Sequence, residues 1–288
     1  MGINREYKDS VFSFLFSDPD TLRELYGALE GITLDPGIPI TINTLEGVLY
    51  KTFLNDISFE VGNKLVVLIE HQSTINPNMT VRLLMYIARV YEKLTAGKNM
   101  YGSKKLTIPR PEFIVLYNGT APYPDEMVLK LSDAFEDAAV LGITGDRGMD
   151  LELRVKVYNI NQGRNEPITR RCEKLNGYTV LIAKAREFEA EIAGDRNPPK
   201  LSDDEKEKAM TLAVRWCIAH NILKPFLELH GSEVVNMLMT EWKLEDALVV
   251  EREEGREEGR EEGQNMVLEL VKQGYSAEQI EAKLAALQ

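Results

Sequence analysis

The chain has 288 residues, of which 44% are hydrophobic and 28% are charged, so it can form one large domain or two ordinary ones. Its formal net charge of −12 argues against a protein that coats nucleic acid. No apolar run approaches the ~20 residues of a membrane span, and the first ten residues lack the apolar core of a signal peptide. Its two cysteines, Cys172 and Cys217, are too few for a disulfide framework or a zinc site. We therefore expect a cytoplasmic protein without a membrane partner.

The first part of the chain is expected to be helical. Apolar side chains recur at helical spacing between residues 7 and 30, and Pro19 divides this stretch into two expected helices. Asp20 is the expected N-cap of the second helix. Residues 38–53 follow a turn and are expected to form the first strand of a sheet.

The next stretch predicts a β-hairpin. Apolar and polar side chains alternate over residues 56–61, which is typical of a half-buried strand. Gly62-Asn63 is a turn signal. Residues 65–69 are all apolar and predict a second strand that is buried on both faces.

Polar side chains follow this second strand and predict a metal site. Glu70 and Gln72 share a face of the strand because side chains alternate, and a turn centred near Asn63 places Asp56 opposite Glu70. Opposed Cβ atoms on paired strands lie roughly 4.5–5.5 Å apart. Two adjacent carboxylates repel unless a proton or a cation separates them, and oxygen ligands suit Mg²⁺ or Mn²⁺. The alternative is two solvated carboxylates, and a shift of one residue in register would separate them.

Residues 79–94 predict an amphipathic helix that carries a basic stripe. Arg82, Tyr86, Arg89 and Lys93 fall on one face of this helix. The stripe would grip phosphates beside the metal site, or it is an ordinary solvated helix face.

A basic loop is expected after this helix. Between residues 80 and 110 the chain has seven basic residues and one acidic residue, a net charge of +6. Lys104 and Lys105 belong to this segment, and together with Tyr101 they are candidates to track a nucleic-acid backbone.

Further strands and helices complete the expected fold. Residues 113–117 predict a short buried strand, residues 132–139 a helix, and residues 151–157 a half-exposed strand with alternating side chains. From Pro167 onward the pattern is helical. We therefore expect an α/β protein in which helices cover a sheet.

The C-terminal part predicts a linker and a small hairpin. Residues 250–263 contain three REEG repeats, and each glycine inside a helix costs about 1 kcal/mol relative to alanine. The hairpin that follows, residues 264–288, is too small for a core of its own and is expected to dock on a second copy. The expected division thus has four parts: a core at 1–165, a helical region at 166–249, the linker at 250–263 and the hairpin at 264–288.

Two sets of residues resemble known families. Asp56, a β-hairpin and then Glu70-x-Gln72 resemble the core of PD-(D/E)XK nucleases. The residues Glu70-His71-Gln72-Ser73, Asn78-Met79, Arg82-Leu83-Leu84 and Tyr86 are similar to the signature of the recombination-promoting nuclease/putative transposase (Rpn-like) family. Its flanking motifs are similar to Asp9-x-x-Phe12 and Leu116-Tyr117-Asn118-Gly119. Gln72 stands where the superfamily usually has lysine, and Ser13 stands where a basic residue often occurs.

The resemblance implies a restriction-endonuclease-like mixed sheet flanked by helices and a Mg²⁺-dependent DNA endonuclease active in recombination, mobile-element movement or phage defence. Asp56 and Glu70 would bind Mg²⁺ or Mn²⁺, Gln72 would complete the catalytic set, and Arg82 would offset phosphate charge. The alternative is a nuclease fold with little or no turnover that acts as a DNA-binding, regulatory or oligomeric module. Gln72 favours that alternative, because a neutral amide supplies no positive charge.

Overall fold

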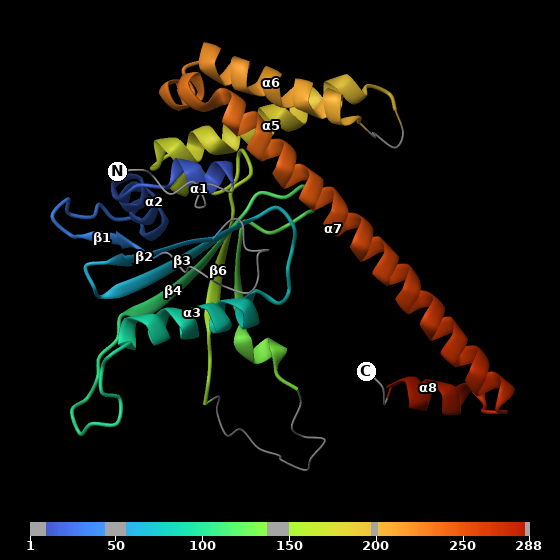
Figure 1. Ribbon diagram of the computed structural model, residues 1–288. Helices are drawn as coiled ribbons and strands as arrows, with labels where there is room; N and C mark the ends of the chain where they lie inside the picture. The colour runs from blue at the N-terminus through green and yellow to red at the C-terminus, as the bar shows by residue number, and fades with distance from the viewer. Residues whose placement is uncertain (1–9, 44–55, 137–149, 197–200, 286–288) are drawn as a thin grey trace. The chain divides into compact units, whose positions relative to one another are not determined.

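The computed structural model describes residues 10–43, 56–136, 150–196 and 201–285 (Figure 1). The chain divides into two compact units, Met1–Met239 and Thr240–Gln288. The helices are α1 (Val11–Leu15), α2 (Pro19–Glu30), α3 (Met79–Thr95), the 3-10 helix η2 (Leu131–Ala134), α4 (Glu166–Thr169), α5 (Glu173–Ala193), α6 (Asp203–Ala219), α7 (Lys224–Lys272) and α8 (Ala277–Ala285). The strands are β1 (Ile40–Ile42), β2 (Asp56–Val61), β3 (Leu65–Gln72), β4 (Arg110–Tyr117), β5 (Glu126–Lys130) and β6 (Arg154–Asn159).

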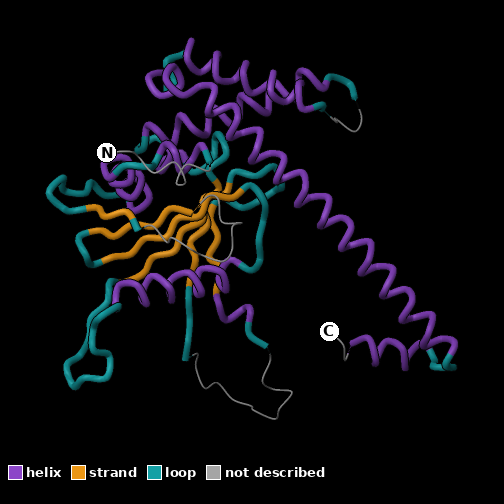
Figure 2. Tube along the Cα trace, in the orientation of Figure 1, coloured by secondary structure: helices purple, strands orange, loops and turns teal. Residues whose placement is uncertain are grey.

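The first unit is built around a six-stranded mixed sheet with the strand order β1-β2-β3-β4-β6-β5 (Figure 2). The central strands β3, β4 and β6 are parallel, whereas β1–β2, β2–β3 and β5–β6 are antiparallel pairs. Parallel neighbours require crossover connections, and α3 provides the one between β3 and β4. The expectation of an α/β protein with a mixed sheet flanked by helices is therefore confirmed.

The β2–β3 hairpin fixes the register on which the candidate site depends. Gly62 and Asn63 both have positive φ angles, +58° and +55°. Two such residues form a tight turn whose twist matches that of the flanking strands. The turn pairs Val61 with Leu65 and, at the far end of the hairpin, places Asp56 opposite Glu70. The predicted register is therefore confirmed at the level of the backbone.

Helices cover both faces of the sheet. Helix α3 lies on one face, and α1, α2 and α5 lie on the other (Figure 1). The core under α3 contains Val66 and Leu68 of β3, Leu83, Ile87 and Val90 of α3, Val115 of β4, and Val155 and Val157 of β6. On the opposite face, the ring of Tyr26 in α2 contacts that of Phe59 in β2 at a centroid distance of 6.2 Å. Even-numbered positions of β3 therefore face α3, and odd-numbered positions face α1, α2 and α5.

Helix α2 begins two residues earlier than the sequence pattern suggested. Its N-cap is Asp18, whose carboxylate accepts hydrogen bonds from the backbone N–H groups of Asp20 and Thr21 at 3.0 and 3.1 Å. Pro19 occupies the first helical position, where its missing N–H is harmless. The predicted N-cap at Asp20 is therefore wrong.

The sheet differs from the expected one mainly at its edges. Strand β5 has no counterpart in the sequence analysis, because an edge strand with exposed Met127 and Val128 lacks the alternation that marks a half-buried strand. Where a helix was expected over residues 132–139, the structure has the short 3-10 helix η2. Residues 137–139 lie outside the described residues. Most of the strand expected over residues 38–53 also lies outside them, and β1 covers only Ile40–Ile42.

The C-terminal helices include the predicted linker. Ser202 and Glu205 form a capping box at the start of α6. Helix α7 contains residues 250–263 without a break, so the predicted linker is helical. Glutamate and arginine are good helix formers, and ion pairs such as Arg260–Glu257, at 3.0 Å, add small increments along the exposed helix. The division into four parts stays a prediction. No helix in the described ranges is long and apolar enough to span a membrane.

Candidate functional site

The candidate site lies at the end of β3, on the face of the sheet that α3 covers. Glu70 is paired with Asp56 of β2 on one side and with Val115 of β4 on the other. Gln72 follows two residues later on the same face and is partly exposed. The side chain of Asp56 lies outside the described part of the molecule, so the convergence of the two carboxylates stays a prediction.

Glu70 forms a nearly buried ion pair with Arg82. The Nη2 atom of Arg82 lies 2.8 Å from Oε1 of Glu70, and the two side chains are 25% and 7% exposed. Arg82 reaches the carboxylate from the first turn of α3, which begins at the N-cap residue Asn78 directly after the strand-end loop. Removing one partner of such a pair leaves the other charge buried and uncompensated, which is strongly destabilising. Arg82, predicted to grip phosphate, therefore neutralises Glu70 in this structure.

The residues at this strand end fit a small, hard metal ion. Mg²⁺ and Mn²⁺ prefer carboxylate, carbonyl and water oxygens, and positions 56, 70 and 72 offer two carboxylates and an amide. Arg82 contacts Oε1 of Glu70, and a carboxylate has a second oxygen that can bind an ion. No cluster of three or more His, Cys, Asp or Glu side chains occurs among the residues whose side chains are described. The fit therefore depends on Asp56.

The other predicted DNA-binding residues lie farther along the chain, in α3 and in the loop that follows it. Arg89 is half-buried in the helix, and Lys104 and Lys105 are exposed in the loop between α3 and β4. A helix of 17 residues is about 25 Å long, and this loop follows its far end (Figure 1). The structure thus brings Arg82 to Glu70 and leaves the two lysines at the opposite end of the helix.

Two motifs of the sequence analysis pack against each other at the ends of β3 and β4. They are Glu70-His71-Gln72-Ser73 and Leu116-Tyr117-Asn118-Gly119. A Cβ atom added to Gly119 would lie 1.7 Å from the carbonyl oxygen of Ser73 and 2.5 Å from the hydroxyl of Tyr117. Only a glycine permits this approach. The backbone N–H of Asn118 also donates to the carbonyl of Gln72 at 3.1 Å. Gly119 therefore holds the strand-end loop that carries Gln72 and Ser73.

His71, which lies between Glu70 and Gln72 in β3, points to the opposite face of the sheet and is buried in a polar network. His71 is 3% exposed, and its ring stacks on Phe12 of α1 at 4.9 Å. Its Nε2 atom lies 3.0 Å from the hydroxyl of Tyr178 in α5, which also accepts a hydrogen bond from the Asn118 side chain at 3.2 Å. Arg186 donates to the carbonyl of Asn118 and thereby extends the network along α5. The motif residues His71 and Asn118 thus join two strands to two helices.

The same network reaches the end of β6 through Asn161. Its side-chain N–H group donates to the carbonyl of Gly119 at 3.0 Å, and its side-chain oxygen accepts from Arg186 at 2.9 Å. The amide of Asn159 in turn donates to the carbonyl of Tyr123 at 3.1 Å. These bonds fix the loops that leave β4 and β6, so the carboxyl edge of the sheet is rigid beneath Gln72.

Tyr178, Arg186 and Asn161 were not predicted from the sequence. Tyr178 and Arg186 lie more than 100 residues after His71, in a stretch whose periodicity indicates only a helix. Asn161 lies in a loop, where asparagine is common without any wider role. No local signal in the sequence identifies these three as partners of the motif residues.

Burial lowers the pKa of His71 from 6.5 to about 3, and the positive charge of Arg186 adds to this effect. The folded protein therefore binds no proton here between pH 6.5 and about 3, whereas the unfolded chain does. The contribution of the neutral His71 ring to the free energy of unfolding is complete above pH 6.5. It falls by up to about 1.4 kcal/mol per pH unit as the pH decreases toward 3.

The corresponding experiment compares the parent protein with His71→Gln by urea unfolding at pH 7, 6 and 5. We expect the variant to be less stable at pH 7, because glutamine replaces the stacked ring, and the difference to shrink as the pH falls. A difference that is constant over this range would show that His71 does not titrate as a buried neutral group.

Taken together, the fold and the site define a mixed α/β protein whose sheet presents a carboxylate–arginine pair at a strand end. Residues 49–153 match the family model described as "Putative transposase, YhgA-like". This range contains every predicted site residue and confirms, over its length, the resemblance to the Rpn-like putative transposases. No curated protein and no solved structure matched the chain.

Proposed function

We propose that the protein is a metal-dependent DNA endonuclease with a PD-(D/E)XK site, and that it acts in DNA recombination, mobile-element movement or phage defence. The observation that carries the proposal is the β2–β3 register, which places Asp56 opposite Glu70 at the end of a central strand. The match of residues 49–153 to a family of putative transposases supports a substrate of DNA. The cytoplasmic location expected from the sequence is part of the same proposal.

In this proposal, Asp56 and Glu70 hold one Mg²⁺ or Mn²⁺ ion. When bound, the ion supplies Lewis-acid polarisation of the scissile phosphate and lowers the pKa of a bound water. Gln72 orients that water or a phosphate oxygen through its amide, which donates and accepts hydrogen bonds. Arg82 keeps a positive charge beside Glu70 and close to the incoming phosphate. The network around His71 and Asn118 holds the strand end that positions these groups.

The second candidate function is a DNA-binding or regulatory module with little turnover. Two observations favour it. Gln72 replaces the usual lysine, and the Arg82 charge that would offset phosphate is already paired with Glu70. Both candidates bind DNA, so only a cleavage assay separates them.

The test is cleavage of supercoiled plasmid and of linear DNA by the full-length protein with Mg²⁺, with Mn²⁺ and with chelator. The proposed function requires nicking or linearisation that depends on the metal ion. Binding of DNA without any cleavage in either metal would reject the nuclease and support the regulatory module.

We also propose that the C-terminal unit mediates self-association. Met266, Leu268 and Val271, near the end of α7, are 45–55% exposed. In helix α8 only Ile280 is recorded as buried among the side chains described there. Exposed apolar residues on so small a unit favour contact with a second copy of the same unit.

Deletion of the second unit tests this contact. A chain ending at Met239 is expected to keep the sheet and its network but to lose self-association, because the boundary between the units lies there. Multi-angle light scattering of the two proteins gives their masses in solution, and circular dichroism monitors the fold. Equal oligomeric states would exclude the tail as the contact.

A further inference from the structure

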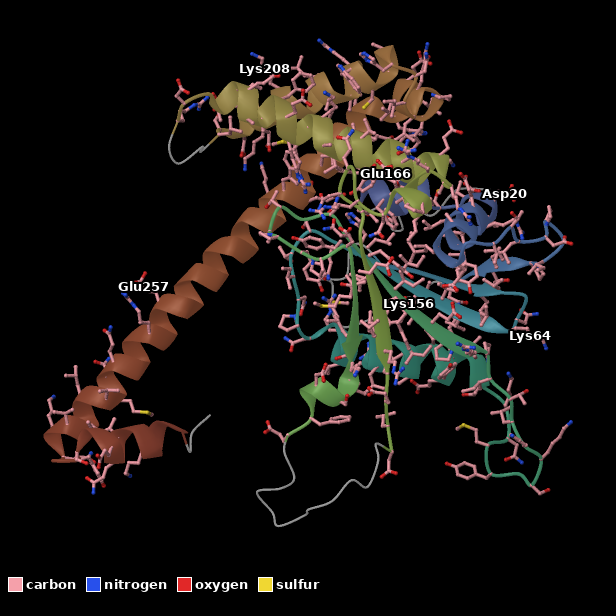
Figure 3. The ribbon with its side chains drawn as sticks, turned by 180° about the vertical axis from the view of Figure 1, so that it is seen from behind. Asp20, Lys64, Lys156, Glu166, Lys208 and Glu257 are labelled. Carbon is pink, nitrogen blue, oxygen red and sulfur yellow. The ribbon has the colours of Figure 1, made fainter. Side chains whose placement is uncertain are left out.

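A polar pocket lies at the hairpin end of the sheet, away from Glu70. Its volume is ≈ 320 Å³, within the range of small-molecule sites. The residues that line it come from β2, the hairpin turn, the end of α3 and the loop before β4, and they include Glu60, Lys64, Leu94, Lys98, Ile108 and Pro109. Figure 3 labels Lys64 at this end of the hairpin.

The walls of this pocket are held together by hydrogen bonds to backbone carbonyl groups. The N–H group of Arg110 donates to the carbonyl of Lys64 at 2.8 Å, which joins the hairpin turn to the start of β4. The hydroxyl of Tyr91 in α3 donates to the carbonyl of Pro109 at 2.7 Å. The hairpin, the helix and the loop are thus tied together, and the pocket is formed before any ligand arrives.

Glu60 is the unusual residue in the pocket. It pairs with Val66 and therefore faces the α3 side of the sheet, where it is only 8% exposed. Within the described ranges, no side chain forms a hydrogen bond or an ion pair with its carboxylate. A carboxylate without such partners keeps its acceptor positions available to a ligand. A ligand that donates hydrogen bonds to Glu60 would fill these positions.

The remainder of the pocket suggests the other parts of the ligand. Lys64 and Lys98 are exposed at its rim and attract an anion. Leu94, Ile108 and Pro109 offer apolar contacts to a flat ring. A molecule with N–H donors at one end, an aromatic body and a phosphate at the other end meets all three requirements, which describes a nucleotide.

We propose that this pocket binds a guanine nucleotide. Guanine presents two adjacent donors, N1–H and N2–H, on its Watson–Crick edge, and a carboxylate can accept both. Cytosine and adenine offer one amino group each, and thymine offers only its N3–H. Lys64 and Lys98 would hold the phosphate.

If the ligand is a nucleotide of a DNA strand, the pocket deepens the proposed function and rests on it. Val66, opposite Glu60, is four residues from Glu70, a separation of roughly 13 Å along the strand. The protein would then read an unpaired guanine some nucleotides away from the bond at Glu70. Free dGMP offers the same chemistry, and the experiment distinguishes these two sources.

The experiment is calorimetric titration of the full-length protein, in chelator, with dGMP, dCMP, dAMP and dTMP. We expect dGMP to bind at least about tenfold more tightly than dTMP, because two donors meet the carboxylate. Glu60→Gln should remove this preference and weaken dGMP binding about tenfold or more. The matched control is Glu92→Gln, which removes an exposed carboxylate from the same end of α3. Equal affinity for all four nucleotides, or no binding of dGMP, would overturn the proposal.

A second variant keeps the test decisive if Glu60→Gln does not fold. Lys98→Ala changes only an exposed side chain, and it should weaken dGMP binding while leaving binding of deoxyguanosine unchanged. Equal weakening for nucleotide and nucleoside, or no weakening for either, would contradict the phosphate assignment.

The source of the nucleotide follows from competition between dGMP and a short single-stranded oligonucleotide with one guanine. Tighter binding of the oligonucleotide assigns the pocket to a DNA strand, and tighter binding of dGMP assigns it to the free nucleotide. Because these titrations contain no metal, they do not depend on cleavage. A protein that binds dGMP but cuts no DNA keeps the pocket and loses the proposed nuclease.

Discussion

Asp56→Asn and Glu70→Gln are each expected to lower the rate of Mg²⁺-dependent DNA cleavage by at least about 100-fold. Each substitution removes a negative charge from the proposed metal site and keeps the shape of the side chain. A bound metal ion contributes several kcal/mol of stabilisation to a phosphoryl transition state, and a factor of 100 corresponds to about 2.7 kcal/mol. The measurement is the initial rate of plasmid nicking at saturating Mg²⁺, with the parent in chelator as the baseline.

The same two variants should differ in stability. Glu70→Gln removes the charge that lies 2.8 Å from Nη2 of Arg82, so we expect a lower melting temperature for this variant. Asp56→Asn removes one of the two carboxylates that are predicted to converge, and it is expected to leave the melting temperature in chelator equal or higher.

A matched control is Glu126→Gln, at an exposed position of the edge strand β5. It should change neither the cleavage rate nor the melting temperature. If Asp56→Asn and the parent protein cut equally well, the activity comes from another site or another protein, and the nuclease proposal is rejected.

Gly119→Ala, two residues after the end of β4, is expected to be strongly destabilising. The new Cβ atom would lie 1.7 Å from the carbonyl oxygen of Ser73, and a backbone atom cannot move away as a flexible side chain can. The loop after β3 or the end of β4 would have to shift, and the bonds of Asn118 would break with it. We expect a loss of more than about 3 kcal/mol in the free energy of unfolding, measured by urea denaturation, or a failure to fold.

The control for this substitution is Gly102→Ala. The nearest atom to its added Cβ is the side-chain nitrogen of Asn99, at 3.1 Å, in an exposed loop where the side chain can rotate. The free energy of unfolding of this variant should lie within about 0.5 kcal/mol of that of the parent. A Gly119→Ala protein of normal stability would show that the two motifs do not pack as closely as described.

The register of the hairpin could be predicted because its determinants are local. Gly62 and Asn63 specify a tight turn, and the apolar run that follows specifies which strand is buried. Counting outward from the turn then places Asp56 opposite Glu70. The same reasoning located α3 almost to the residue, since the amphipathic pattern begins at Met79.

The ion pair between Glu70 and Arg82 could not be predicted from the sequence, because it depends on tertiary packing. The sequence indicates that Arg82 lies on the first turn of α3, but its direction depends on how the helix crosses the sheet. That crossing is set by the packing of residues such as Leu83 and Ile87 on β3 and β4. The contact between Arg82 and Glu70 is therefore an observation of the structure, whereas the predicted contact between Arg82 and phosphate stays a prediction.

The order of the strands has a consequence for the smallest piece of the chain that could fold alone. Among the described strands, β5 pairs only with β6, so it cannot join the sheet until β6 has been added to β4. The family match ends at residue 153, one residue before β6 begins. A fragment cut at that boundary would expose the edge of β4 and leave β5 unpaired, which favours aggregation. During synthesis, the sheet likewise stays incomplete until β6 and the α5 residues behind His71 have emerged, and an expression fragment should therefore extend past Arg186.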